Sequence, residues 1–305
     1  MKNKFIAILL LFTFVTYSQE NNLNMKSELI ESPKGIIEYT IQGSGKPILI
    51  IHGGNDNCFT DIKQQHLLEG NYKVIIPSRP GYGKTSISYG KTAAEQADFM
   101  KFLIDTLKIE KIAVIAHSAG GATALEFAKK YPQNCVCLIL EDATTKTWVP
   151  KFTPKYFAMK YIFNPKRQHK LWERQRKEFN ENRDKHIKRI SKMFSTLKPE
   201  VIIKEWSEED IVSYGEALKL MNSGEGFIHT LDHKAKDIHL IKVPCLISHS
   251  PFDKDVPFSH ALYANKKIEG SELFVSPAKS HLIYQGKDFI YILEKRYSFL
   301  KANNW

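Results

Sequence analysis

The sequence predicts an α/β fold, in which a mostly parallel β-sheet is covered by helices on both faces and a helical insertion caps one end. Strand-like apolar runs alternate with helix-like segments between about residues 35 and 132. This alternation stops after Asp142 and resumes at Val243. Because strand–helix–strand connections place successive strands in parallel, we expect a core of residues 19–142 and 237–305 and a helical cap of residues 143–236.

The first part of the core contains strands and helices in regular order. Two helices are expected between these strands. One begins at the capping box from Thr92 to Glu95 and runs to about Leu107, and the other spans residues 119–130 and ends before Pro132. The expected strands are short runs rich in β-branched residues, at residues 36–42, 47–51, 72–77, 112–116 and 136–140.

The second part of the core repeats this pattern after the insertion. Strands are expected at residues 243–248 and 272–275. Helices are expected around residues 258–267 and from about residue 285 to 300. The last helix closes the α/β pattern.

The amino terminus has the pattern of an export signal. Lys2 and Lys4 precede an apolar stretch over residues 5–15, and Ser18 is a small residue at a suitable cleavage position. The apolar stretch is too short to span a bilayer. We therefore expect residues 1–18 to be removed as a signal peptide and the mature protein to be periplasmic or secreted. Export permits disulfides, but the four cysteines show no C-x-x-C spacing and are expected to be buried small hydrophobic residues.

Ser118 lies where a buried strand is expected to turn sharply into a helix. Such a turn exposes a serine hydroxyl as a nucleophile and leaves no room for large side chains two residues before and after it. Ala116 and Gly120 occupy those positions. The helix amino terminus adds backbone N–H groups, including that of Ala119, which suit a developing oxyanion.

A base and an orienting acid are expected on later loops at the same end of the sheet. Asp253 follows the strand at 243–248, and His281 follows the strand at 272–275. His52, Gly53 and Gly54 follow an earlier strand, and the Gly54 N–H is expected to form an oxyanion hole with that of Ala119. These positions predict a Ser118–His281–Asp253 triad.

These motifs resemble the α/β-hydrolase superfamily from about Gly35 to the carboxyl terminus. The resemblance rests on the oxyanion loop at 52–54, the stretch Arg79-Pro80-Gly81-Tyr82-Gly83 and the elbow at 116–120, where Ala116 replaces the usual glycine. It implies an eight-stranded sheet with a helical lid after the sixth strand. Some members place the triad acid after that sixth strand, so Glu141 and Asp142 stay open as alternatives to Asp253. A serine nucleophile argues against the haloalkane dehalogenase and epoxide hydrolase branches.

The positive charge of the chain is concentrated in the cap. The formal net charge is +11, and residues 146–192 contain 15 Lys and Arg against 4 Asp and Glu, interspersed with aromatic residues. The segment is either a solvated helical face or a surface for peripheral contact with anionic membranes or substrates. No nucleic-acid-reading motif accompanies the charge, so nucleic acid is not an expected partner.

The expected function is that of an exported serine hydrolase that cleaves a carboxylic ester through an acyl-enzyme. The same triad would also serve an aminopeptidase, lactonase, C–C hydrolase or acyltransferase acting on a small-molecule ester or amide. A non-catalytic binding protein with this fold is a further alternative. No cofactor or metal is expected.

Overall fold

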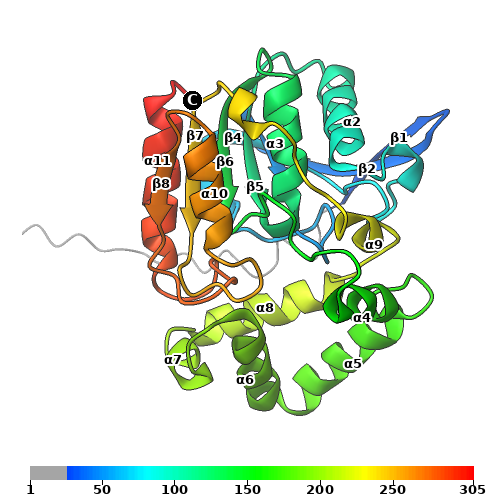
Figure 1. The fold of residues 1–305 in the computed structure, drawn as a ribbon, viewed down its shortest axis with the longest axis vertical. Coiled ribbons are helices and arrows are strands. Elements are labelled where there is room, and N and C mark those ends of the chain that lie inside the picture. The colour runs from blue at the N-terminus through cyan, green and yellow to red at the C-terminus, as the bar shows by residue number, and fades with distance from the viewer. Residues whose placement is uncertain (1–25) are drawn as a thin grey trace, which may run out of the picture.

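A computed structural model describes residues 26–305, and it contains the predicted α/β fold (Figure 1). Eight strands form one sheet in the order β1-β2-β4-β3-β5-β6-β7-β8. Their bounds are β1 Glu28–Ser32, β2 Gly35–Gln42, β3 Lys46–Ile51, β4 Tyr72–Pro77, β5 Ile112–His117, β6 Cys135–Glu141, β7 Cys245–His249 and β8 Glu272–Val275. From β4 to β8 the neighbouring strands are parallel, whereas β1, β2 and β4 pair antiparallel. The predicted fold class is confirmed.

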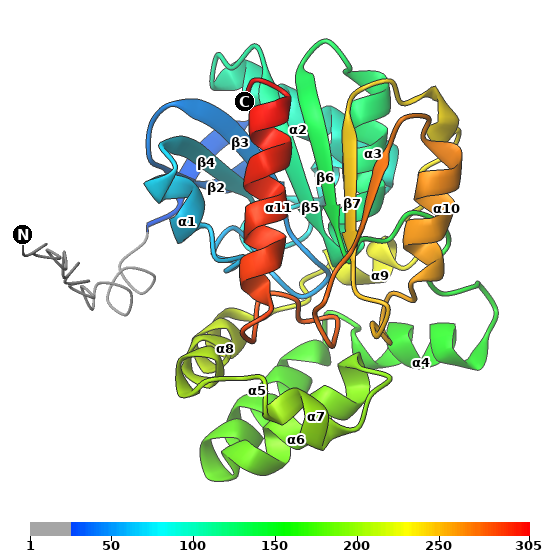
Figure 2. The same cartoon turned by 90° about the vertical axis from the view of Figure 1, so that its left-hand side faces the viewer.

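The central strands are apolar on both sides because helices cover both faces of the sheet. Along β5, Ile112 and Val114 pack into the core on one face, while Ala113 and Ile115 pack into the core on the other. Helices α2 (Ala93–Thr106), α3 (Gly121–Lys130) and α10 (Ser259–Lys267) cover the first face. Helices α1 (Gln65–Glu69) and α11 (Phe289–Ala302) cover the second, and Figure 2 shows α11 lying along the sheet.

Most predicted element bounds agree with the structure to within two residues, and the differences have local causes. The last helix begins at Phe289, later than the expected residue 285, because Gly286 adopts φ +91° in a preceding turn. Residues Ser118–Gly120 form a 3-10 turn, so α3 itself starts at Gly121. Strand β1, which pairs with β2 as a hairpin, and the five-residue helix α1 were not predicted from the sequence.

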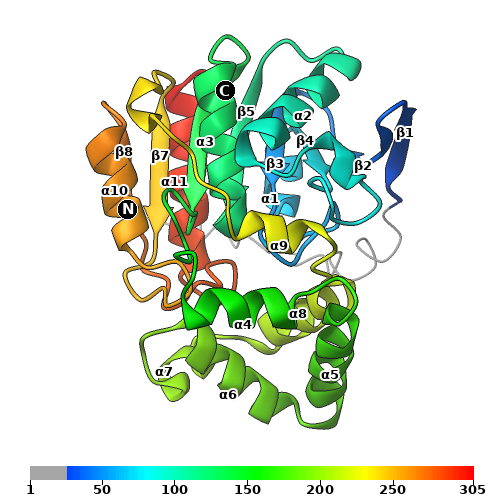
Figure 3. The same cartoon turned by 45° about the vertical axis from the view of Figure 1, so that its right-hand side comes forward.

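The cap follows β6 and covers the carboxyl ends of the parallel strands (Figure 3). Its helices are α4 Pro154–Ile162, α5 Gln168–Glu181, α6 Arg183–Phe194, α7 Pro199–Ile203, α8 Glu208–Leu220 and α9 Gly226–Thr230. The cap has a small apolar core of its own, which includes Trp172, Ile190, Trp206 and Tyr214. A second apolar cluster, which includes Phe227, joins the cap to the loops of the sheet.

Two further expectations concern export. All four cysteines are buried and none is in a disulfide. Among residues 26–305, no helix is long and apolar enough to cross a membrane. The expected signal peptide, residues 1–18, lies outside the described residues.

Candidate active site

Ser118 sits at the tip of the turn between β5 and α3, in the left-handed backbone conformation (φ +49°) that such an elbow imposes. The neighbouring positions have no room for larger side chains. A Cβ atom on Gly120 would lie 2.3 Å from the Ile51 carbonyl oxygen, and Ala116 is fully buried in β5. The small residues around Ser118 are therefore steric requirements of the turn.

The structure brings the three predicted triad residues together. His281 Nε2 lies 2.9 Å from Ser118 Oγ, and His281 Nδ1 lies 2.6 Å from Asp253 Oδ2. The other oxygen of Asp253 accepts hydrogen bonds from the Asp255 and Val256 N–H groups at 2.8 and 2.9 Å. Since carboxylates only accept, the His281 Nδ1–H donates to Asp253, and its Nε2 is left to accept the Ser118 proton.

The charged forms of Asp253 and His281 stabilise each other. Burial alone would raise the pKa of Asp253, but the charge and hydrogen bond of His281, with the nearby His249, hold it well below its ordinary value. Burial alone would lower the pKa of His281, but the carboxylates of Asp253, Asp255 and Asp56 outweigh it and raise the pKa above 6.5. Asp253 is therefore an anion that stabilises the imidazolium form of His281.

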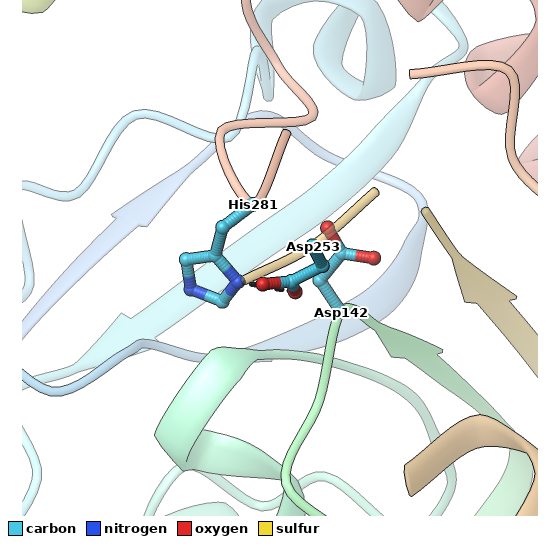
Figure 4. Close-up of side chains that lie close together, drawn as sticks. All are labelled: Asp142, Asp253 and His281. Atoms are coloured by element: carbon cyan, nitrogen blue, oxygen red, sulfur yellow. Dashed lines mark hydrogen bonds and ion pairs between the residues drawn. The ribbon is translucent and has the colours of Figure 1, made fainter. Parts of the chain in front are cut away.

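The two alternative acids do not contact His281 in this way. Glu141 accepts two hydrogen bonds from the fully buried Arg296, at 3.0 and 2.8 Å, and a third from Tyr284 at 2.7 Å. Asp142 lies beside Asp253, as Figure 4 shows, and its Oδ1 accepts the Ser250 N–H. Burial, with Asp253 adjacent, holds the pKa of Asp142 well above its ordinary value, which disfavours the anion that a triad acid needs. Of the three candidates, the geometry favours Asp253 as the triad acid.

Within residues 26–305, one group of side chains has spacing suitable for a metal ion: Asp142, Asp253 and His281. The ligand atoms of Asp253 and His281 already bind each other, and a cation there would displace the hydrogen bond that orients the base. These residues therefore fit a triad better than a metal centre.

The two predicted oxyanion residues are neighbours. A Cβ atom on Gly54 would lie 3.6 Å from the Ala119 Cβ. It would also lie only 2.9 Å from a ring carbon of Phe227, so the cap residue Phe227 packs directly against the oxyanion loop. Ser118 is 8% exposed and His281 4% exposed, which shows that the cap is closed over them.

Two carboxylates near the nucleophile were not singled out from the sequence. Asp255 Oδ2 lies 3.9 Å from His281 Nε2, on the side that faces the reacting atoms. Asp56 follows the oxyanion loop, and a Cβ atom on Gly53 would lie 3.4 Å from both Asp56 Oδ2 and Ser118 Cβ. Burial raises the pKa of Asp56 to about 6. Both residues lie on irregular loops, so no periodic pattern placed them near Ser118.

The cap also contacts the triad through Phe194, another residue that the sequence analysis did not select. Its ring stacks on the His281 ring with centroids 5.7 Å apart, and its backbone carbonyl accepts a hydrogen bond from the backbone N–H of His281 at 3.0 Å. The backbone of the neighbouring Ser195 forms an isolated antiparallel β-bridge with that of Asp253. The end of α6 thus contacts both the base and the acid.

The elbow at Ser118, the strand order and the hydrogen-bonded triad are features of the α/β-hydrolase fold. Comparison with known protein families identifies the same class. Residues 46–284 match the family described as alpha/beta hydrolase fold, and the chain belongs to this family. It is 36% identical over 270 residues to the uncharacterized hydrolase YcgS of Bacillus subtilis, an alignment that covers 87% of this chain and 95% of that protein.

Other relatives and solved structures cover different shares of the chain. A 2-hydroxy-6-oxo-6-phenylhexa-2,4-dienoate hydrolase of Comamonas testosteroni is 31% identical over 113 residues, or 34% of this chain and 39% of that protein. An alpha/beta hydrolase fold protein from Nakamurella multipartita matches with a TM-score of 0.74 at 20% identity, covering 91% of this chain and 99% of the other. An esterase from Exiguobacterium antarcticum matches with a TM-score of 0.65 at 22% identity, covering 90% and 100%. The two structures show the shared fold.

Proposed function

We propose that this protein is a serine hydrolase that cleaves carboxylic esters of small molecules. The observation that carries the proposal is the unbroken hydrogen-bonded chain from Ser118 Oγ through His281 to Asp253. The hydrogen bonds orient each group for acyl transfer, because Asp253 accepts the Nδ1–H of His281 and the Nε2 of the neutral ring faces the Ser118 hydroxyl.

The reaction proceeds in two halves. Ser118 Oγ attacks the ester carbonyl carbon while its proton moves to His281 Nε2, and the N–H groups of Gly54 and Ala119 bind the resulting oxyanion. When the intermediate collapses, His281 donates that proton to the leaving alkoxide, and an acyl-enzyme remains. Water then attacks the acyl carbon with His281 as base, which releases the acid and restores Ser118.

The charge around the nucleophile supports an ester over a carbon–carbon bond in an anionic substrate. The Comamonas protein is named for a dienoate, which carries a carboxylate. Here Asp255 Oδ2 lies 3.9 Å from His281 Nε2 and Asp56 follows the oxyanion loop, and in their ionised forms both would repel a second carboxylate bound near Ser118. Neutral esters and lactones meet no such repulsion. Aminopeptidase and acyltransferase activities use the same residues and remain the alternatives that a substrate panel separates.

The first test is labelling with a fluorophosphonate probe, followed by a panel of p-nitrophenyl esters of increasing chain length. We expect the wild-type protein to be labelled and Ser118→Ala to be unlabelled, with kcat lowered by at least about 10⁴-fold, because the nucleophile is lost. Ser298→Ala, at an exposed position on α11 far along the chain from the site, provides a folded control. An unlabelled wild-type protein with an intact thermal transition would contradict the proposal and favour a binding protein.

We further propose that the mature protein acts outside the cytoplasm, with its amino terminus near Gln19. The order of basic, apolar and small residues at the start of the chain supports this proposal. N-terminal sequencing of the protein recovered outside the cytoplasm checks it, and a protein retained inside with Met1 intact would contradict it.

A further inference from the structure

Arg79 is a buried cation whose presence needs an explanation. Its side chain is fully buried beside the oxyanion loop. None of its hydrogen bonds within the described chain goes to a carboxylate, and its Nε has no partner there. Burying a guanidinium without a directly bonded anion is unfavourable unless it gains other interactions.

The main contact of Arg79 is with a single backbone oxygen. Its Nη2 donates to the Gly53 carbonyl oxygen at 2.7 Å, the shortest hydrogen bond that the side chain makes. The Arg79 guanidinium also lies 4.6 Å from the centre of the Tyr82 ring, and its Nη1 contacts Gln96 and Thr230 at 3.3 and 3.4 Å. These contacts hold the guanidinium in one place behind the oxyanion loop.

His52 holds the same carbonyl from a second direction. The Arg79 N–H donates to His52 Nε2 at 2.9 Å, so this nitrogen accepts and the ring proton sits on Nδ1. His52 Nδ1 lies 2.9 Å from the Gly53 oxygen, to which it therefore donates. The Gly53 carbonyl thus receives two hydrogen bonds, one of them from a cation.

Two bonds to this carbonyl fix the orientation of the next N–H. The described chain contains no cis peptide, and in a planar trans peptide the C=O and the following N–H point in opposite directions. The Gly53 oxygen points toward Arg79, so the Gly54 N–H points away from Arg79.

We propose that Arg79 is a positioning residue for the oxyanion hole, which aims the Gly54 N–H at the developing oxyanion and strengthens it as a donor through the Gly53–Gly54 peptide. A cation bound to the carbonyl oxygen draws electron density from the peptide and makes its N–H a better donor. The positive charge also lies one peptide away from the oxyanion, in a site with little water. This inference rests on the proposed acyl-transfer chemistry.

The test compares two equally buried arginines. Arg79→Gln and Arg79→Lys are made beside Arg296→Gln and Arg296→Lys, because Arg296 is fully buried but pairs with Glu141 away from the oxyanion loop. The measurements are kcat, KM, thermal unfolding and the inhibition constant of a trifluoromethyl ketone, whose adduct with Ser118 carries an oxyanion.

We expect Arg79→Gln to lower kcat about a hundredfold and to weaken trifluoromethyl ketone binding by the same factor, with KM changed less than about threefold. Arg79→Lys keeps the charge without the planar fork, and we expect it to lose about tenfold in both quantities. The Arg296 variants should lower the unfolding temperature and leave kcat and ketone binding within about threefold in whichever of them folds.

The opposite pattern overturns the inference. If Arg79 serves only stability, its folded variants keep kcat and ketone affinity, as the Arg296 variants do. If Arg79→Gln does not fold, kcat and the ketone inhibition constant of Arg79→Lys decide between a positioning role and a purely stabilising role. A wild-type protein that cleaves no ester and takes no fluorophosphonate contradicts the proposed function itself, which is a different result from an active wild type with unaffected Arg79 variants.

Discussion

At the scale of single residues, the protonation of His281 is set by carboxylates on three different loops. Asp253 binds its Nδ1, whereas Asp255 lies 3.9 Å from its Nε2 and Asp56 lies on the loop after Gly54. All three raise the pKa of His281 against the effect of burial. Because His281 acts as a base only when it is neutral, these charges move the onset of activity to higher pH.

The prediction at this scale is that Asp255→Asn shifts the acid limb of kcat/KM to lower pH, since an anion near Nε2 is removed and the pKa of His281 falls. The measurement is kcat/KM for a neutral ester between pH 4 and 9. The exposed Asp105, on α2 and paired with Lys101, provides the control Asp105→Asn, which should leave the limb unchanged. An unmoved limb in Asp255→Asn would show that Asp255 does not act on His281.

The sequence predicted the catalytic residues that lie at or just after the carboxyl ends of strands. Ser118 lies at the end of β5, Asp253 four residues after β7, and His281 after β8, so a parallel sheet brings them to one edge. The roles of Arg79 and Asp255 depend instead on how irregular loops fold against each other. The orientation of a backbone carbonyl, such as that of Gly53, cannot be predicted from the order of residue types.

At the scale of elements, the end of α6 forms a strap between the cap and the catalytic loops, and we define the strap as residues 194–196. The Phe194 carbonyl accepts the His281 N–H at 3.0 Å and the Lys254 N–H at 3.3 Å. The Thr196 N–H donates to the Phe252 carbonyl at 2.9 Å, and Ser195 Oγ donates to the Lys279 carbonyl at 2.5 Å. The strap therefore holds the acid loop and the base loop together.

The strap is one of two places where the cap is held against the loops of the sheet. Lifting the strap would separate His281 and Asp253 from their backbone supports. At the other side, α9 contacts Gly54 through the Phe227 ring. Helix α9 is also bonded to the core, because the Gly226 N–H donates to the Gly81 carbonyl at 2.9 Å and Thr230 Oγ1 lies 2.9 Å from the Tyr82 hydroxyl oxygen. Both sides of the cap are therefore held against the loops of the sheet.

Removal of the Phe194 ring tests the strap. Phe194→Ala should lower kcat about five- to tenfold with little change in KM, because the ring stacked on His281 is worth about 1 kcal/mol and holds the base in line with Ser118. Met193→Ala is the matched control, since Met193 is the preceding residue and is 51% exposed. A loss in KM alone, or an equal loss in both variants, would contradict a positioning role for Phe194.

Sequence patterns also predicted the long elements better than the short ones. Helix α2 was located by its capping box, which the structure contains between Thr92 and Glu95, and β5 by its apolar run. Strand β1 was missed because an edge strand pairs on one side only and is largely exposed, so its sequence carries little apolar alternation. The late start of α11 follows from the backbone of Gly286, which composition does not show.

At the scale of the whole molecule, the charge is unevenly divided between core and cap. The basic segment at residues 146–192 forms α4, α5 and most of α6, which lie together beyond the carboxyl ends of the parallel strands (Figure 3). Large apolar side chains are exposed beside these cations. Phe152 is 83% exposed in a left-handed backbone conformation, and Tyr161 on α4 is 64% exposed. Aromatic residues among lysines suit the interface of an anionic lipid surface.

We propose on this basis that the cap binds anionic membranes peripherally, and we expect the wild-type protein to sediment with vesicles containing phosphatidylserine but not with purely phosphatidylcholine vesicles. Binding should weaken as salt rises from 0.05 to 0.5 M, because the attraction is screened. Lys166→Glu with Lys170→Glu should weaken it roughly thirtyfold, at about 1 kcal/mol for each lost cation. Lys108→Glu with Lys111→Glu makes the same charge change at the opposite end of β5 and should weaken it much less. If both pairs reduce binding equally, net charge alone is responsible, and the cap has no special role at the membrane.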